Sequence, residues 1–174
     1  MAGAGVTLTI KVDFQADELN DEFRTELQNI EPRIGSAMAA VASAAKSSLK
    51  SHIQSDVYDK WSPTTYIRTG GIISDGAIET TASSSRMSLE YTPSGSSEQW
   101  EHPVSGSALV GRIESGSGYE WSRHPGARPF WQKFVDEMIN GGMATAFDSA
   151  MYAELGDIYE GGTVVSRDSA DGEY

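Results

Sequence analysis

The sequence predicts an α+β fold, because strand-like, helix-like and again strand-like segments follow one another before a final helix. Residues 6–14 alternate apolar and polar side chains, which is the period of a strand with one buried face. Residues 17–53 carry apolar side chains at spacings of three and four, as in a helix with one buried stripe. Residues 77–83 and 86–92 are two β-rich runs joined by a Ser-rich turn. We therefore expect an N-terminal strand, a long helix, an antiparallel β-meander and a C-terminal helix packed on the sheet.

The long helix is expected to begin at Asp17, whose carboxylate suits the N-cap position. Pro32 lies inside the helical pattern, and a proline there removes one backbone hydrogen bond. We therefore expect a kink or a short break near Glu31. The apolar stripe of this helix consists of Leu19, Phe23, Leu27, Ile30, Ile34, Met38, Val41, Ala45, Leu49 and Ile53.

The C-terminal half is expected to contain a loop, a helix and a tail. Residues 93–118 are rich in Gly, Ser and Pro, which predicts a long functional or mobile loop. Residues 128–155 have a helical pattern that is weakest at a Gly-Gly pair. Residues 157–174 are acidic and are expected to form a flexible tail. The remaining residues, 1–156, are expected to form one α+β domain.

The predicted core combines the strand, the long helix and the final helix. Phe130 and Phe134 are four residues apart and so share one face of that helix. The side chains expected to be buried are Val6, Leu8, Ile10, Phe23, Leu27, Ile34, Leu49, Phe130 and Phe134.

The composition restricts the classes of function. The chain has 174 residues, no Cys and a formal net charge of −12. Disulfides and thiol chemistry are therefore excluded, and tight nucleic-acid binding is not expected, because the surface repels phosphates. The first residues do not resemble a signal peptide, and no apolar run has the length of a membrane span. We expect a protein that is made in the cytoplasm and has no contact with a membrane.

The known catalytic motifs are absent from the sequence, so we expect no catalysis, no metal and no cofactor. One alternative is a metal-dependent hydrolase that uses Glu98, Glu101 and His102, although a Gly/Ser loop is a poor scaffold for ligands. His52 is expected to lie at or near the surface of the long helix, and His124 to be a polar turn residue. A further alternative is a monomeric binding module that uses the aromatic residues of 119–131.

Aromatic and arginine side chains gather around the turn before the final helix. Those that do not fit the core stripe are candidates for a subunit interface, where Trp, Tyr and Arg concentrate. The candidates, including one carboxylate from the same segments, are Arg68, Glu114, Tyr119, Trp121, Arg128 and Trp131. We expect Trp131 to project away from the core stripe. Arg68 or Arg128 is expected to bind a carboxylate, with Glu114 as the nearest candidate, and the alternative is two solvated arginines.

Several short motifs occur in a fixed order along the chain. They are Arg68-Thr69-Gly70 within "YIRTGGI" (66–72), the set Glu114, Gly116 and Tyr119 within "RIESGSGYEW" (112–121), and Arg128-Pro129-Phe130 within "PGARPFWQKFVDEM" (125–138). In this order and on these elements, the chain resembles the neck or tail-completion proteins at the head–tail junction of tailed bacteriophages. The resemblance covers roughly residues 6–152. It departs from the family pattern at Gly71, which follows Thr-Gly in place of a larger apolar residue, and in the length of the loop.

The resemblance implies a structural virion protein without catalysis, located at the head–tail junction. It implies a homo-oligomeric ring, six-fold or alternatively twelve-fold, that contacts portal-side connector proteins and the tail terminator, tube or sheath. DNA would pass through this ring. The acidic balance suits such a conduit, because it would not bind the DNA tightly.

Overall fold

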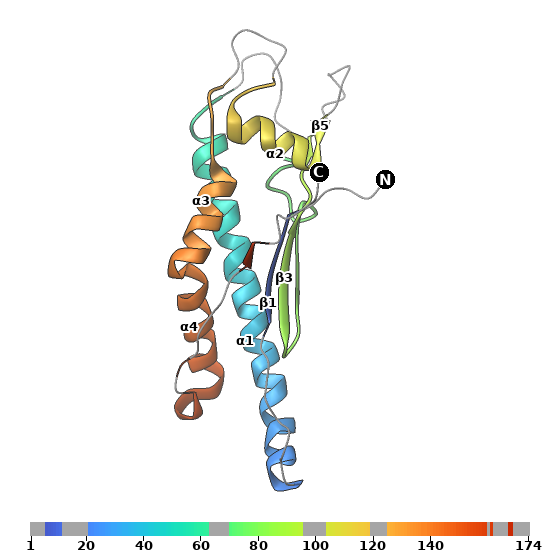
Figure 1. Cartoon of the computed structure of the whole chain (residues 1–174), viewed down its shortest axis with the longest axis vertical. Helices are drawn as coiled ribbons and strands as arrows, with labels where there is room; N and C mark the ends of the chain where they lie inside the picture. Colours follow the sequence, from blue (N-terminus) through green and yellow to red (C-terminus); the bar gives the residue numbers. More distant parts are fainter. Residues whose placement is uncertain are drawn as a thin grey trace.

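A computed structural model describes residues 6–11, 21–62, 70–95, 104–118, 125–159, 161 and 167–168. The molecule is elongated along its longest helix, α1 (Asp21–Ile53), which lies between two other layers (Figure 1). A small sheet covers one side of α1, and the C-terminal helices α3 (Phe130–Glu137) and α4 (Met143–Leu155) cover another. The predicted α+β class is confirmed.

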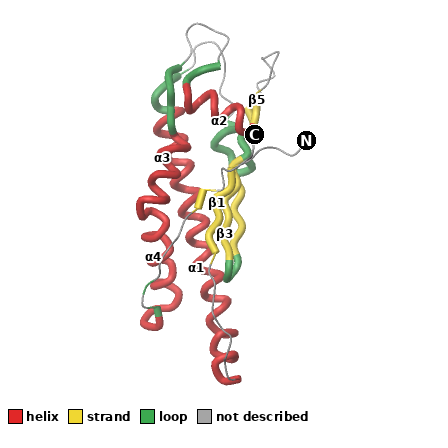
Figure 2. Tube along the Cα trace, in the orientation of Figure 1, coloured by secondary structure: helices red, strands yellow, loops and turns green. Residues whose placement is uncertain are grey.

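The main sheet has the strand order β2-β3-β1-β6, and all its pairs are antiparallel. The strands are β1 (Val6–Lys11), β2 (Ile78–Ala82), β3 (Arg86–Tyr91) and β6 (Arg167–Asp168). β2 and β3 are the hairpin predicted over 77–83 and 86–92. Figure 2 shows these strands on one side of the helices. A second, two-stranded pairing joins β4 (Ser94–Gly95) to β5 (Val104–Ser105).

α1 can contact two layers because its apolar surface is broad. At 3.6 residues per turn, its buried side chains from Ala37 to Ile53 cover an arc of roughly 160°. Ala37, Ala42 and Ala45 are small, so neighbouring elements approach closely. The final helices consequently pack on α1. The expectation that they pack on the sheet is corrected in the main, because their larger contact is with α1. Among the described side chains, Phe130 and Trp131 at the start of α3 do contact the sheet, at Tyr91 of β3.

Most of the side chains predicted to be buried are buried, among those that the structure describes. Ile34, Leu49, Phe130 and Phe134 are buried, whereas Leu27 is only half-buried. The side chains of Val6, Leu8, Ile10 and Phe23 lie outside the described set, as does the proposed N-cap Asp17. α1 continues through Pro32 without the expected break.

The predicted loop over 93–118 is wrong for residues 106–115, which form helix α2 (Gly106–Ser115). A short π-helical turn, η1 (Gln54–Tyr58), follows α1, and a kink, η2 (Met138–Gly142), joins α3 to α4. Gly141, in the predicted weak point, has a φ of 113°. A 3₁₀ turn, η3 (Gly156–Ile158), follows α4, and most of the predicted tail lies outside the described residues.

Candidate functional site

The end of α2 and the start of α3 are locked together by a backbone crossing. The Arg128 N–H donates to the Ile113 carbonyl at 3.0 Å, which brings the segment before α3 onto the last turn of α2. Gly116 has a φ of 65°, and a Cβ at this position would lie 2.3 Å from the backbone nitrogen of Ala127. Only glycine fits such a close approach. We call residues 113–116 and 126–132 the α2–α3 clamp.

Glu114 completes the clamp by capping α3. Its carboxylate accepts hydrogen bonds from the Trp131 N–H at 2.7 Å and from the Gln132 N–H at 3.4 Å. These N–H groups have no partner within the helix, and a carboxylate there also suits the helix dipole. Burial raises the pKa of Glu114, and the two backbone hydrogen bonds offset only part of this effect.

Arg128 lies inside the clamp, with 7% of its surface exposed. Its guanidinium carbon is 5.9 Å from the ring centroid of Trp61, within the range of a cation–π contact. Among the described residues, the hydrogen bonds that the Glu114 carboxylate accepts come from the start of α3. Whether Arg128 or Arg68 binds a carboxylate stays a prediction, and Arg68 lies outside the described residues.

Aromatic rings fill the space beneath the clamp. Trp131 stacks on Tyr91 with centroids 5.7 Å apart and an interplanar angle of 8°, and it lies 5.4 Å from Phe134. Phe130 meets Tyr91 edge-on at 6.0 Å, and the Tyr91 hydroxyl donates to the Ile72 carbonyl at 3.0 Å. The half-buried Trp131 is therefore packed against the core, which corrects the expectation that it projects away from it.

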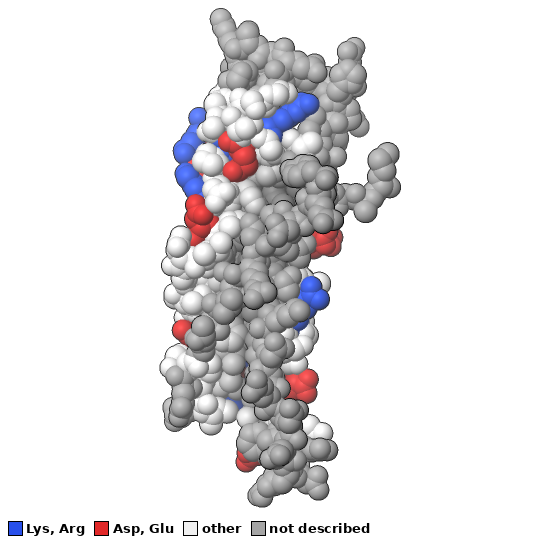
Figure 3. All heavy atoms as spheres, in the orientation of Figure 1, with Lys and Arg blue, Asp and Glu red and all other residues white. Residues whose placement is uncertain are grey.

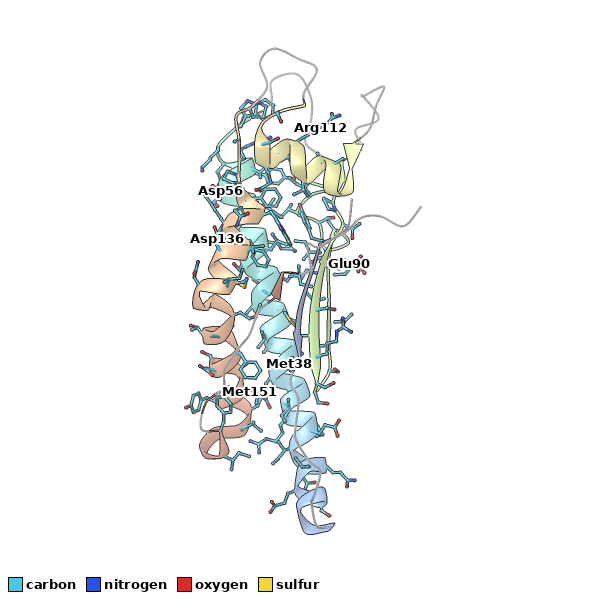
Figure 4. The ribbon with its side chains drawn as sticks, viewed as in Figure 1. Met38, Asp56, Glu90, Arg112, Asp136 and Met151 are labelled. Carbon is cyan, nitrogen blue, oxygen red and sulfur yellow. The ribbon has the colours of Figure 1, made fainter. Side chains whose placement is uncertain are left out.

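A group of charged side chains joins the end of α1 to α3 on the outside of these rings. Asp56 in η1 is 4% exposed and accepts hydrogen bonds from Lys60 Nζ at 2.6 Å and Lys133 Nζ at 2.7 Å. Burial raises the pKa of Asp56, but the bonds from Lys133 and Lys60 lower it by more, so the pKa lies below its ordinary value of 3.8. Figure 4 shows Asp56 where α3 runs beside the end of α1.

His52 extends this group to Glu137 at the C-terminal end of α3. Its Nε2 is 2.6 Å from Glu137 Oε2, and its Nδ1 is 3.8 Å from Asp56 Oδ2. Ser48 Oγ donates to the other Glu137 oxygen at 3.1 Å. We call these side chains (Ser48, His52, Asp56, Lys60, Lys133 and Glu137) the α1–α3 latch. Figure 3 shows basic and acidic groups beside one another over this part of the molecule.

Both assemblies hold neighbouring elements together through side-chain contacts. In the latch, the Glu137 carboxylate accepts a hydrogen bond from Ser48 with one oxygen and contacts His52 with the other. Within the described residues, no three His, Cys, Asp or Glu side chains are placed to hold a metal ion. The same residues include no helix with the length and apolar character needed to cross a membrane.

Comparison with known proteins identifies the family of the chain. The model of the YomN family matches residues 16–154, which is most of the sequence. The chain belongs to the YomN family. This family is phage-derived and is represented in a Bacillus prophage. Comparison with curated proteins found no match, and comparison with solved structures found none either.

The YomN match includes all the elements that build the two assemblies. It extends over α1, the β2–β3 hairpin, α2 and α3, and it ends one residue before the end of α4. The clamp and the latch therefore belong to the YomN part of the molecule, whereas β1 and β6 lie outside it.

The YomN chain brings together two of the motifs that the sequence singled out. Glu114 contacts Trp131 and Gly116 approaches Ala127, so the first motif lies directly beside Arg128-Pro129-Phe130 in the clamp. Tyr119 and Trp121 lie outside the described residues, as do Glu98, Glu101 and His102 of the hydrolase alternative. Sequence reasoning missed the latch, although the spacing of four between His52, Asp56 and Lys60 was an available signal.

Proposed function

We propose that this YomN-family chain is a structural virion protein at the head–tail junction of a tailed phage. It would form a ring around the DNA conduit, six-fold or alternatively twelve-fold, between portal-side connectors and the tail terminator, tube or sheath. The observation that carries the proposal is the match of residues 16–154 to a phage-derived family. The resemblance of the sequence motifs to neck proteins supplies the specific location.

The positions and contacts of the motif residues in the fold support a structural role. Glu114 caps a helix, Gly116 permits a backbone crossing, and Phe130 is fully buried in the core. Each of these residues stabilises a defined shape at one end of the elongated molecule (Figure 1). A ring subunit needs such a rigid end, because every copy must present the same surface to its neighbours.

The charge of the chain supports the placement beside DNA. A formal net charge of −12 disfavours binding to phosphates along the conduit, so that DNA can move past the subunits. Of the six sequence candidates, Arg68, Tyr119 and Trp121 would supply contacts between subunits, because Glu114, Arg128 and Trp131 already make contacts within the chain.

Deletion of the gene from its phage or prophage tests this function. We expect induced cells to accumulate filled heads and finished tails that are not joined, as seen by electron microscopy, and complementation with the intact gene to restore virions. Labelling of a tagged copy should mark the neck in complemented particles. Deletion particles with joined tails and full infectivity would contradict the proposal, as would a tagged copy absent from purified virions.

A further inference from the structure

Strand β2 lies at an edge of the main sheet, and among the described strands none lies on the side away from β3. All five of its residues are paired in register with β3, without a bulge. The strand contains no proline and no lysine, which commonly protect an edge from pairing with another chain, and its one charged residue is Glu79. Within the described part of the molecule, β2 therefore presents a regular edge to further backbone hydrogen bonds.

The backbone groups of alternate residues of β2 point away from β3. The Thr92 N–H donates to the Ala77 carbonyl at 2.8 Å, at one end of the hairpin. The Ser83 N–H donates to the Arg86 carbonyl at 2.7 Å, at the other end. Hydrogen-bonded and non-hydrogen-bonded pairs alternate along antiparallel strands, so the odd-numbered residues of 77–83 face β3. The residues whose N–H and carbonyl groups point to the open edge are Ile78, Thr80 and Ala82.

This edge is complementary to itself when a two-fold axis relates two copies at Thr80. Antiparallel pairing about the axis sets Thr80 opposite Thr80 of the second copy, and Ile78 opposite its Ala82. All outward-facing residues of both copies then form backbone hydrogen bonds, about six in total. Glu79 lies opposite Thr81 of the second copy, so no like charges are directly opposed. An axis at Glu79 would instead oppose the two Glu79 side chains.

The position of α1 above the sheet sets the spacing of such a pair. α1 packs mainly on β2 and β3, and the strands run lengthwise beside it (Figure 1). With strands about 4.8 Å apart and α1 above the space between β2 and β3, the two copies of α1 would lie about 10 Å apart. Helices at about 8–10 Å pack directly on each other. The pairing therefore requires short side chains on the side of α1 that borders the β2 edge.

That side of α1 carries short side chains. Lys46 and Lys50 identify it, because the Nζ atoms of both lie 2.8 Å from Oδ1 of Asp75, just before β2. The same stripe continues toward the start of α1 at spacings of three and four. Its exposed members there are Ser36, Ala39 and Ser43. A second copy brings the same short side chains on its own α1, which makes it a better occupant of the edge than an unrelated strand.

We infer that two copies of the chain associate through their β2 edges, in a two-fold dimer with one continuous sheet and with α1 packed on α1. The contact uses uncharged backbone groups and short side chains, whereas each copy carries a formal net charge of −12. Salt screens the repulsion between the copies and so strengthens the dimer. The inference does not rest on the proposed neck ring, because a two-fold contact is closed between two copies.

Sedimentation equilibrium of the full-length chain tests the association. We expect monomer and dimer in reversible equilibrium between about 1 μM and about 1 mM protein, with tighter association at about 500 mM salt than at about 50 mM salt. A chain that stays monomeric throughout this range at both salt concentrations would overturn the inference. Assembly into larger rings without a dimer would overturn it as well, while supporting the proposed ring.

A matched pair of substitutions tests the contact between the helices. Ala39→Glu places a charge between the two copies of α1, so we expect self-association to weaken at least tenfold. Ala40→Glu is the control: it adds the same charge at the next exposed alanine, which is turned about 100° away around the helix, and it should dimerise like the wild type. Both positions are exposed, so the monomer should fold as before. Equal association of the two variants would overturn the inference.

Cysteine substitutions test the pairing of the strands. The chain has no Cys, so Thr80→Cys introduces a single thiol. Opposite residues of a hydrogen-bonded pair have Cα atoms about 5.5 Å apart, within the range of a disulfide. Copies with Thr81→Cys are the control, because the same axis sets their thiols diagonally, at about 8 Å. Mild oxidation should link Thr80→Cys copies at least tenfold faster than the control. Equal rates would overturn the inference and would leave the gene-deletion test of the neck function unaffected.

Discussion

Gly116 lies where the end of α2 crosses the segment before α3. Its role depends on the small space at this crossing and on its backbone conformation. Its φ lies in the left-handed region, and a Cβ at this position would lie 2.3 to 2.9 Å from backbone atoms of residues 126 and 127. Glu114, two residues earlier, then reaches the start of α3. The Glu-x-Gly motif thus encodes a cap and a crossing, and both act on the segment that contains Arg128-Pro129-Phe130.

Gly116→Ala is expected to lower the free energy of unfolding by about 2–4 kcal/mol, because its Cβ would collide with backbone that cannot move independently. Urea denaturation of the purified chain measures this loss. Gly111→Ala in α2 is the matched control, since a Cβ there meets nothing within 4 Å. Alanine favours a helix, so the control should be unchanged or more stable by up to about 1 kcal/mol. Equal effects of the two substitutions would contradict this account of the clamp.

The sequence predicted the clamp residues as a set, but it did not predict what each one contacts. Arg128, Glu114 and Trp131 were assigned to an interface because their residue types are common there. Trp131 instead stacks on Tyr91, a strand residue 40 positions earlier. No local period reveals a contact between residues so distant in sequence, since it depends on how α3 crosses the end of the sheet.

At the scale of elements, the clearest periodic patterns gave the correct helices and hairpin, and the weakest pattern failed. α2 contains Gly106, Gly111 and Ser115, which have low helix propensity, so residues 93–118 were interpreted as loop. Its helix is instead supported by burial of Val110 and Ile113, three residues apart. Tertiary packing therefore overrides local propensity in this segment.

The latch is expected to contribute to the docking of α3 on the end of α1. Asp56→Asn removes a buried carboxylate that accepts two lysine hydrogen bonds, so we expect a loss of about 1–3 kcal/mol in the free energy of unfolding. Denaturation followed by tryptophan fluorescence measures it, because Trp131 lies on α3. Asp59→Asn, an exposed change in the next turn, should cost less than about 0.5 kcal/mol. Asp56→Asn without a measurable loss would show that Lys60 and Lys133 contribute nothing through this residue.

The whole molecule combines acidic groups whose pKa values are shifted in opposite directions. Asp75 accepts hydrogen bonds from Lys46 and Lys50 at 2.8 Å each, which lowers its pKa to about 2. The pKa of Asp56 is lowered as well, whereas burial raises that of Glu114 above its ordinary value of 4.5. The net charge of −12 adds general repulsion at neutral pH. The pH dependence of the free energy of unfolding follows from the raised pKa of Glu114 and the lowered pKa values of Asp56 and Asp75, because these groups titrate in different pH ranges.

We expect the free energy of unfolding to rise as the pH falls from 7 through the raised pKa of Glu114, because the folded state then binds more protons than the unfolded state. Below the ordinary value of 3.8, the unfolded state protonates Asp56 and Asp75 first, so stability is lost as the pH falls further. Urea denaturation across this range should therefore show a maximum at mildly acidic pH. Glu114→Gln should flatten the rise on the neutral side, and Asp75→Asn should flatten the fall on the acid side. A stability that instead increases steadily up to neutral pH would mean that Glu114 is ionised in the fold at no cost, and the account of its burial at the α3 cap would be wrong.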